Sequence, residues 1–243
     1  MGSLLVELYV GTSGWLYDWN LGGSLEWYAR RSGLNAVELN SSFYRMPFPS
    51  QVRSWSVRGR SLRWSVKILQ YISHYYKLSG RALELWDRFR GLFKPMEDLI
   101  DFYLLQLPPS FKSSEESRVK LSDFARSTGL KWRLAVEFRH KSWFNEGTVR
   151  LCRDLEVTLV SIDSPIGMVV WSSGSTVYLR LHGRSEWYLY NYSLEELREL
   201  GRAILELKPE KAYVFFNNNH YMLENARTML RVLGALGSSG NTG

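Results

Sequence analysis

Cysteine and long apolar runs are nearly absent from this chain of 243 residues. The single cysteine, Cys152, excludes an internal disulfide, and its helical surroundings predict a packed thiol. No apolar run approaches the ~18 residues that cross a membrane. The N-terminal stretch Met1–Val6 lacks the basic start and long apolar core of a secretory signal. We therefore expect a soluble, cytoplasmic protein.

Acidic residues are absent between Leu39 and Leu83, although the whole chain carries 24 of them and a formal net charge of +7. Basic residues interleaved with aromatic ones fill this segment, and such a surface suits an anionic partner such as nucleic acid. A solvated helix face beside core aromatics is the alternative interpretation. The candidate nucleic-acid contacts are Arg45, Arg53, Arg58, Arg60 and Lys77.

Histidine is also scarce. The four histidines, His74, His140, His182 and His220, lie far apart, and neither an H-x-x-x-H nor a C-x-x-C motif occurs. Permanent zinc sites usually bring such ligands together at short spacing. We therefore expect no cofactor and no resident metal, with a divalent metal as the alternative.

Eight apolar stretches with period-two alternation predict eight strands, most of them followed by a helix. The predicted strands are Leu4–Val10, Ala36–Phe43, Arg63–Leu69, Phe102–Leu107, the stretch from Leu134, Thr158–Asp163, Val177–His182 and Ala212–Phe216. Eight such units favour an α/β fold, a single (β/α)8 TIM barrel with parallel strands, spanning residues 1–236. The helix between Asp163 and Thr176 is expected to be weak or missing, and residues 237–243 read as a flexible tail.

An open doubly wound sheet is the alternative architecture. Its glycine-rich phosphate loop usually follows the first strand, but Gly11-Thr-Ser-Gly-Trp15 does not match G-x-G-x-x-G. The barrel therefore remains the preferred prediction.

Polar residues collect at the carboxyl ends of the predicted strands, where barrel active sites lie. If the apolar alternates face the helices, these side chains point into the lumen and converge. For general acid/base chemistry the candidates are Glu38, Glu137, Asp163 and His182. For substrate binding they are Trp15, Asn40, Lys67, Gln106, Arg139, Arg180, Asn217 and Asn219.

Mutual pairing of these groups is the structural alternative, with Glu38 beside Lys67 and Glu137 beside Arg139 or Arg180. About ten convergent polar residues exceed what structure requires, because buried charges are costly unless paired. We therefore favour a functional mouth and a functional Glu137. On that interpretation Glu137→Gln leaves stability nearly unchanged and abolishes ligand binding, whereas a structural Glu137 predicts a loss of roughly 3–5 kcal/mol.

A series of motifs spans nearly the whole chain in order. They are Gly11-Thr-Ser-Gly-Trp15, Glu38-Leu-Asn-Ser-Ser-Phe-Tyr44, Gln106-Leu-Pro-Pro-Ser110, Val136-Glu-Phe-Arg-His140, Arg180-Leu-His-Gly183 and Phe216-Asn-Asn218. This set resembles the YecE-like family, domain of unknown function 72. The resemblance implies a TIM barrel and no particular reaction.

Three functional hypotheses remain at this point. The first is an enzyme that acts, without a redox cofactor, on a phosphate- or carboxylate-bearing substrate in the barrel mouth. The second is a nucleic-acid-binding, nuclease-like protein that uses residues 39–83. The third is a binding module for a small ligand without catalysis.

Overall fold

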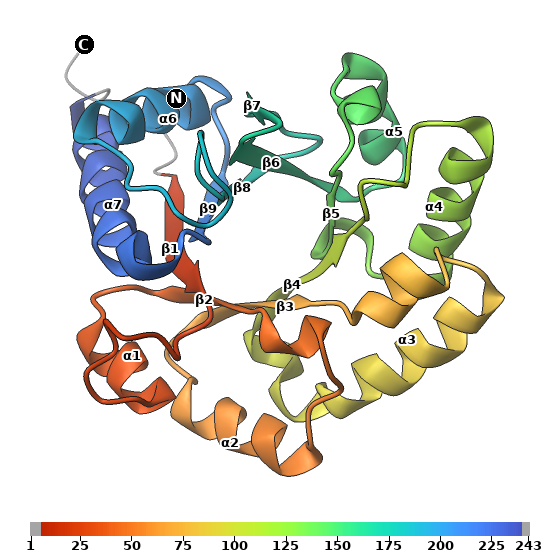
Figure 1. The fold of residues 1–243 in the computed structure, drawn as a ribbon, viewed down its shortest axis with the longest axis horizontal. Coiled ribbons are helices and arrows are strands. Elements are labelled where there is room, and N and C mark those ends of the chain that lie inside the picture. Colours follow the sequence, from red (N-terminus) through yellow and green to blue (C-terminus); the bar gives the residue numbers. More distant parts are fainter. Residues whose placement is uncertain (1–5, 240–243) are drawn as a thin grey trace.

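Eight parallel strands close into a barrel in the structure, a computed structural model that describes residues 6–239 (Figure 1). The strand order around the barrel is β1-β2-β3-β4-β5-β6-β8-β9, and β9 pairs again with β1. The predicted TIM barrel is therefore confirmed. The barrel strands are β1 (Glu7–Ser13), β2 (Ala36–Leu39), β3 (Arg63–Lys67), β4 (Ile100–Gln106), β5 (Leu134–Glu137), β6 (Thr158–Ser164), β8 (Thr176–Leu181) and β9 (Lys211–Phe216).

Helices surround the barrel on the outside (Figure 1). The α-helices are α1 (Leu25–Arg31), α2 (Pro49–Arg58), α3 (Gly80–Leu92), α4 (Glu115–Thr128), α5 (Glu146–Asp154), α6 (Leu194–Glu206) and α7 (Met222–Ser239). Local sequence sets several of their ends. Ser193 and Glu196 form the expected capping box of α6, and Ser24 caps α1. Of the described residues, no helix is both long and apolar enough to cross a membrane.

The connection between β6 and β8 contains no helix. A short strand, β7 (Gly167–Val169), folds back antiparallel on β6, and the chain then runs extended into β8. Ser161 fixes this return, because its hydroxyl accepts from the Trp171 amide and donates to the Trp171 carbonyl. The weak or missing helix is confirmed.

The first strand lies later in the chain than predicted. It runs from Glu7 to Ser13, whereas the prediction was Leu4–Val10, and Leu4 and Leu5 fall outside the described residues. Gly11 was taken as the start of a turn. It lies inside the strand, where an added Cβ would sit 2.2 Å from the Ala36 carbonyl oxygen. This glycine serves close strand packing, and the extension carries Ser13 into the barrel mouth.

Two further boundaries also differ from prediction. Phe43 was placed in the second strand, but β2 ends at Leu39 and Phe43 belongs to the short helix η1 (Ser41–Phe43). At the other end of the chain, α7 continues to Ser239, so residues 237–239 of the predicted tail are helical. Residues 240–243 lie outside the described residues.

Aromatic rings fill the lower half of the lumen. Tyr9 stacks on Tyr213 at 4.6 Å, and Phe102 meets Tyr213 and Tyr178 edge-on at 4.8 and 5.1 Å. These buried rings fill the space between the strands, as expected for an eight-stranded lumen. The polar residues above this plug are therefore reached from the carboxyl end of the strands.

Candidate ligand site at the mouth of the barrel

A buried ionic cluster lies directly above the aromatic plug and is centred on Arg180 of β8. Its guanidinium donates from Nε and Nη2 to the two oxygens of Glu38, at 2.9 and 2.5 Å, and from Nη1 to Glu137 Oε2. Ser13 and Tyr178 also donate to Glu38, at 2.5 and 2.9 Å. All of these donors and acceptors are buried. Arg180 therefore ties β2, β5 and β8 together across the lumen.

Glu137 has no free oxygen in this cluster. Arg139 Nε donates to Oε1, and Arg180 donates to Oε2. Burial alone would raise the pKa of Glu137, but the guanidiniums of Arg139 and Arg180 hold it well below its usual range. Glu137 therefore remains an ionised partner of two arginines at neutral pH.

His182 stays neutral beside these arginines. Burial, followed by the nearby Arg139 and Arg180, lowers its pKa well below the usual range. Its Nε2 accepts from Arg139 Nη2 at 3.1 Å, so the ring proton is placed on Nδ1, which lies 3.3 Å from Asn217 Nδ2. Two donors would then face each other, which implies that the side-chain amide of Asn217 presents its oxygen to Nδ1.

Lys67 is the cation of the mouth without a carboxylate partner. Among residues 6–239 no ion pair involves its Nζ, which donates to Asn40 Oδ1 at 3.1 Å and lies 4.0 Å from the centre of the Phe43 ring. Burial and then the nearby Arg180 lower its pKa from 10.5 to about 7, against the opposing pull of Glu38 and Glu137. Two carboxylates already balance the two guanidiniums of the cluster, so the charge on Lys67 is in excess.

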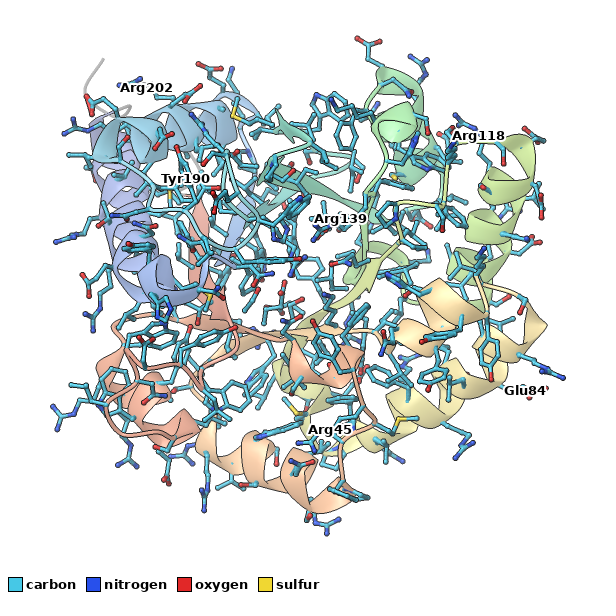
Figure 2. The ribbon with its side chains drawn as sticks, in the orientation of Figure 1. Arg45, Glu84, Arg118, Arg139, Tyr190 and Arg202 are labelled. Atoms are coloured by element: carbon cyan, nitrogen blue, oxygen red, sulfur yellow. The ribbon has the colours of Figure 1, made fainter. Side chains whose placement is uncertain are left out.

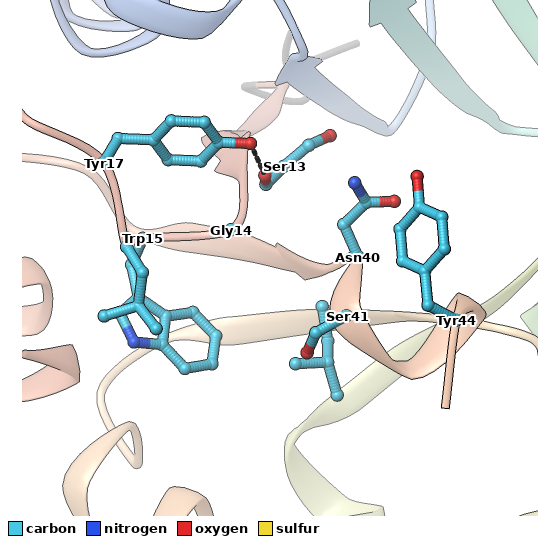
Figure 3. Close-up of a pocket in the computed structure, with 9 residues that line it drawn as sticks. Ser13, Gly14, Trp15, Tyr17, Asn40, Ser41 and Tyr44 are labelled. Carbon is cyan, nitrogen blue, oxygen red and sulfur yellow. Dashed lines mark hydrogen bonds between the residues drawn. The ribbon is translucent and has the colours of Figure 1, made fainter. Parts of the chain in front are cut away.

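A cavity of about 250 Å³ opens over the ends of β1 and β2, and Asn40, which accepts from Lys67, is one of its lining residues (Figure 3). Ser13, Asn40, Ser41 and Tyr44 line it, and Trp15 and Tyr17 form its opposite wall. Trp15 is anchored edge-on against Trp55 and Trp64 at 5.9 and 5.7 Å, so it serves both the outer core and the cavity wall.

Gln106 and Arg139 complete the floor of the mouth. Arg139 Nη2 donates to Gln106 Oε1 at 3.0 Å, and its guanidinium stacks on Trp187 at 4.6 Å. Figure 2 places Arg139 near the centre of the ring of strands. Arg139 is 8% exposed and Lys67 is 4% exposed, whereas Glu38, Glu137, Arg180 and His182 are fully enclosed. Arg139 and Lys67 are therefore the least buried charges of the mouth, and both carboxylates are more deeply buried.

Asp163 was predicted to face the lumen, and this is wrong. Parallel neighbours in register share a face, and Ile162, not Asp163, pairs with the inward-facing Arg180. Asp163 accepts from Arg184 Nε at 2.9 Å outside the barrel wall, beside α6. The error came from assuming that apolar alternates face outward, because in β6 Val160 and Ile162 pack inside the lumen.

Asn219 also lies apart from the cluster. It belongs to the short helix η6 (Asn219–Tyr221), and its carbonyl accepts from Trp19 Nε1 at 3.2 Å. Its neighbour Asn218 is buried and donates to Tyr190 and Asn225, so it supports a loop. Of the three consecutive asparagines, only Asn217 reaches the ionic cluster.

Several contributors to the mouth were not among the predicted site residues. Ser13 and Tyr178 donate to Glu38, Phe43 packs under Lys67, and Trp187 covers Arg139. The alternation of Tyr178 with Arg180 was a usable signal, because both occupy one face of β8. Phe43 lies in the short helix η1 and Trp187 in the loop after β8, where alternation along a strand does not determine side-chain direction.

The basic segment is exposed, as its composition suggested. The side chains of Arg45, Arg53, Arg58, Arg60 and Lys77 all lie on the surface. A pair of exposed tyrosines, Tyr71 and Tyr75, stacks at 4.7 Å on the π-helical turn η2 (Tyr71–Tyr75) between β3 and α3. Phe43 links this turn to the mouth, because its ring lies 5.1 Å from both Tyr44 and His74.

No three His, Cys, Asp or Glu side chains between residues 6 and 239 are grouped so that they could hold a metal ion. The fold and the mouth define a class: a parallel eight-stranded barrel protein with a charged cluster at the carboxyl ends of its strands. Residues 9–241 match the family model described as "Protein of unknown function DUF72". The chain therefore belongs to the DUF72 family.

Solved structures agree with this assignment. A DUF72 family protein from Thermotoga maritima is 29% identical, with a TM-score of 0.78 over 95% of this chain and 99% of that one. Another from Enterococcus faecalis is 22% identical, with a TM-score of 0.81 over 93% and 95%. A xylose isomerase domain containing protein from Salmonella typhimurium shares the fold at 14% identity and a TM-score of 0.57, over 97% and 99%. No functionally curated protein matches the chain.

Proposed function

We propose that this protein is an enzyme that binds a phosphate- or carboxylate-bearing substrate in the barrel mouth and acts on it by general acid/base chemistry. The observation that carries the proposal is Lys67, a buried cation at the floor of the mouth without a carboxylate of its own. An anionic substrate would supply the missing counter-charge. Burying an unpaired charge is costly, so a protein retains one where it has a use.

Lys67 also fits the acid/base role better than the carboxylates do. With a pKa lowered to about 7, its amine can take up or release a proton near neutral pH. Glu38 and Glu137 are occupied by Arg180 and Arg139, and His182 is held neutral. We therefore assign Glu38 and Glu137 to positioning Arg180 and Arg139, and His182 to orienting Arg139.

Sulfate binding tests the first half of this proposal. We expect wild type to bind sulfate at pH 6.5, and Lys67→Met to bind it roughly tenfold or more weakly, the loss expected for one charge-assisted contact. Lys141→Met removes an exposed lysine from the loop after β5 and should bind like wild type. Isothermal calorimetry measures both. Equal affinity in the Lys67 and Lys141 variants would contradict the proposal.

Asp163→Asn should leave sulfate affinity within about twofold of wild type, because Asp163 lies outside the barrel wall against Arg184. Loss of this ion-paired hydrogen bond should cost about 1 kcal/mol of stability. The same titration and a thermal melt check both values. A strong loss of sulfate affinity in Asp163→Asn would show that Asp163 belongs to the binding site after all.

Turnover distinguishes an enzyme from a non-catalytic ligand-binding module. A panel of phosphate monoesters and carboxylic acids, followed by mass spectrometry, should give a product whose rate depends on a group with a pKa near 7 and is lost in Lys67→Met. Binding to Lys67 without any product would support the module instead.

A second candidate function rests on the stacked pair Tyr71 and Tyr75. Exposed aromatic rings beside arginines and lysines suit the bases and phosphates of a single nucleic-acid strand. We expect a short oligothymidylate to bind, and Tyr71→Ser with Tyr75→Ser to weaken it by roughly tenfold or more. Tyr221→Ser is the matched control, because Tyr221 and Tyr71 are both 45% exposed.

Salt dependence tests the electrostatic part of this second function. Neutralising Arg45, Arg53 and Lys77 to glutamine should reduce the slope of log affinity against log salt by about 2, at roughly 0.7 per phosphate contact on a single strand. Fluorescence anisotropy between low and moderate salt measures the slope. An unchanged slope, or no binding at low salt, would leave the segment as a solvated surface.

A further inference from the structure

The environment of Lys67 supports a more specific chemistry than anion binding. A lysine amine attacks carbon only when it is neutral, so a nucleophilic lysine needs surroundings that disfavour its charge. Lys67 is 4% exposed, lies near Arg180, and has no ion-pair partner among the described residues. These surroundings keep a substantial fraction of the amine neutral at physiological pH.

The contacts of the amine also orient it. Asn40 Oδ1 accepts one N–H at 3.1 Å, and the Phe43 ring covers another side at 4.0 Å. Asn40 itself lines the 250 Å³ cavity, so the side chain that accepts from the amine also forms part of the cavity wall (Figure 3). The aromatic face can also stabilise a cationic nitrogen once it has formed.

A guanidinium that can bind a negatively charged group, that of Arg139, follows the nearby strand β5. Arg139 reaches the floor of the mouth and is joined to Gln106 of β4 at 3.0 Å. Its Nη2 contacts also include His182, while its face is covered by Trp187. A substrate that carries an anionic group and a carbonyl group could therefore meet a guanidinium and an amine in the same mouth.

We propose that Lys67 forms an imine with the carbonyl group of an anionic aldehyde or ketone bound in the mouth. This inference rests on the proposed function and names its substrate class. The neutral amine adds to the carbonyl carbon, and one amine proton moves to the oxygen to give a carbinolamine. Loss of hydroxide with the second amine proton releases one water and leaves the C=N bond. No oxidant or reductant is required.

Trapping with glyoxylate, a small anionic aldehyde, tests the proposal on the wild-type protein. Cyanoborohydride reduces an imine of glyoxylate to carboxymethyl-lysine, which peptide mass mapping locates. At pH 7 we expect Lys67 to be labelled about tenfold or more faster than exposed lysines such as Lys77, because far more of its amine is neutral. Lys67→Arg should abolish the fast labelling and Lys77→Arg should not.

Two further arms separate this inference from the proposed function. Oxalate, an anion without an aldehyde, should compete and slow the labelling of Lys67, and acetaldehyde, an aldehyde without a charge, should label it poorly. Sulfate binding that depends on Lys67, without labelling at Lys67, would overturn the imine and leave the anion site standing. Equal labelling by acetaldehyde, unaffected by oxalate, would support the imine and contradict the anion site. Labelling spread over surface lysines alone would overturn the imine.

Discussion

Glu137→Gln is expected to lower the free energy of unfolding by roughly 3–5 kcal/mol, the cost of removing one partner from a buried ion pair. Glutamine keeps the volume of the side chain but removes the negative charge. Arg139 and Arg180, which both pair with the Glu137 carboxylate, then lose that counter-charge. Chemical denaturation at pH 7 measures the change. Glu195→Gln is the matched control, because Glu195 is 78% exposed and its one ion pair within residues 6–239 is with Arg198 at 3.3 Å, so the change should alter stability by less than about 1 kcal/mol.

The pH dependence of this effect has a definite sign. The pKa of Glu137 is lower in the folded protein than in the unfolded chain, so its contribution is present above the unfolded value and is lost as pH falls toward the folded value. The difference between wild type and Glu137→Gln should therefore shrink in acid. A variant as stable as wild type that has lost sulfate binding would restore the functional interpretation of Glu137 that the strand pattern favoured.

Lys67→Met is expected to do the opposite and stabilise the protein at neutral pH, by about 2–5 kcal/mol. A pKa lowered from 10.5 to about 7 means that protonating this amine costs more free energy in the folded protein than in the unfolded chain. Each pKa unit of the difference corresponds to about 1.4 kcal/mol of lost stability. Methionine fills a similar volume without that charge. Groups kept for function often cost stability in this way.

The pH window follows from the same shift. Between pH 7 and 10.5 the unfolded chain binds more protons at this lysine than the folded protein does, so wild-type stability rises with pH in that window. The advantage of Lys67→Met should be full below pH 7 and fade toward pH 10. Lys141→Met, at an exposed site, should follow wild type throughout. A destabilised Lys67→Met at pH 7 would show that the amine supports the fold.

The barrel was predictable because its signals are local and repeated. Alternation in Arg63–Lys67 or Lys211–Phe216, and caps such as Ser193, act over a few residues and do not depend on distant contacts. Gly11 misled the prediction of β1 for the same reason, since the constraint on it comes from Ala36 in another strand. A close approach between two strands cannot be recognised from the residue pattern of either strand alone.

The sequence predicted which residues lie in the site better than it predicted what each residue does there. Glu38, Lys67, Glu137, Arg139, Arg180 and His182 converge as the alternation implied. Asp163 failed because a barrel lumen is apolar in part, and Ile162 fills it at β6. Which carboxylates are saturated and which cation is left over depends on angles across the lumen, and these follow from the closed barrel and not from any one strand.

Proton uptake on sulfate binding is the most direct test of the excess charge at Lys67. Sulfate does not titrate near neutral pH, so any proton taken up belongs to the protein. At pH 8 the free amine is mostly neutral, and bound sulfate should restore its proton. Calorimetric titrations in two buffers of different ionisation enthalpy should give between about half and one proton per sulfate for wild type and none for Lys67→Met. Sulfate binding without proton uptake, or with equal uptake in both proteins, would contradict an anion site built on Lys67.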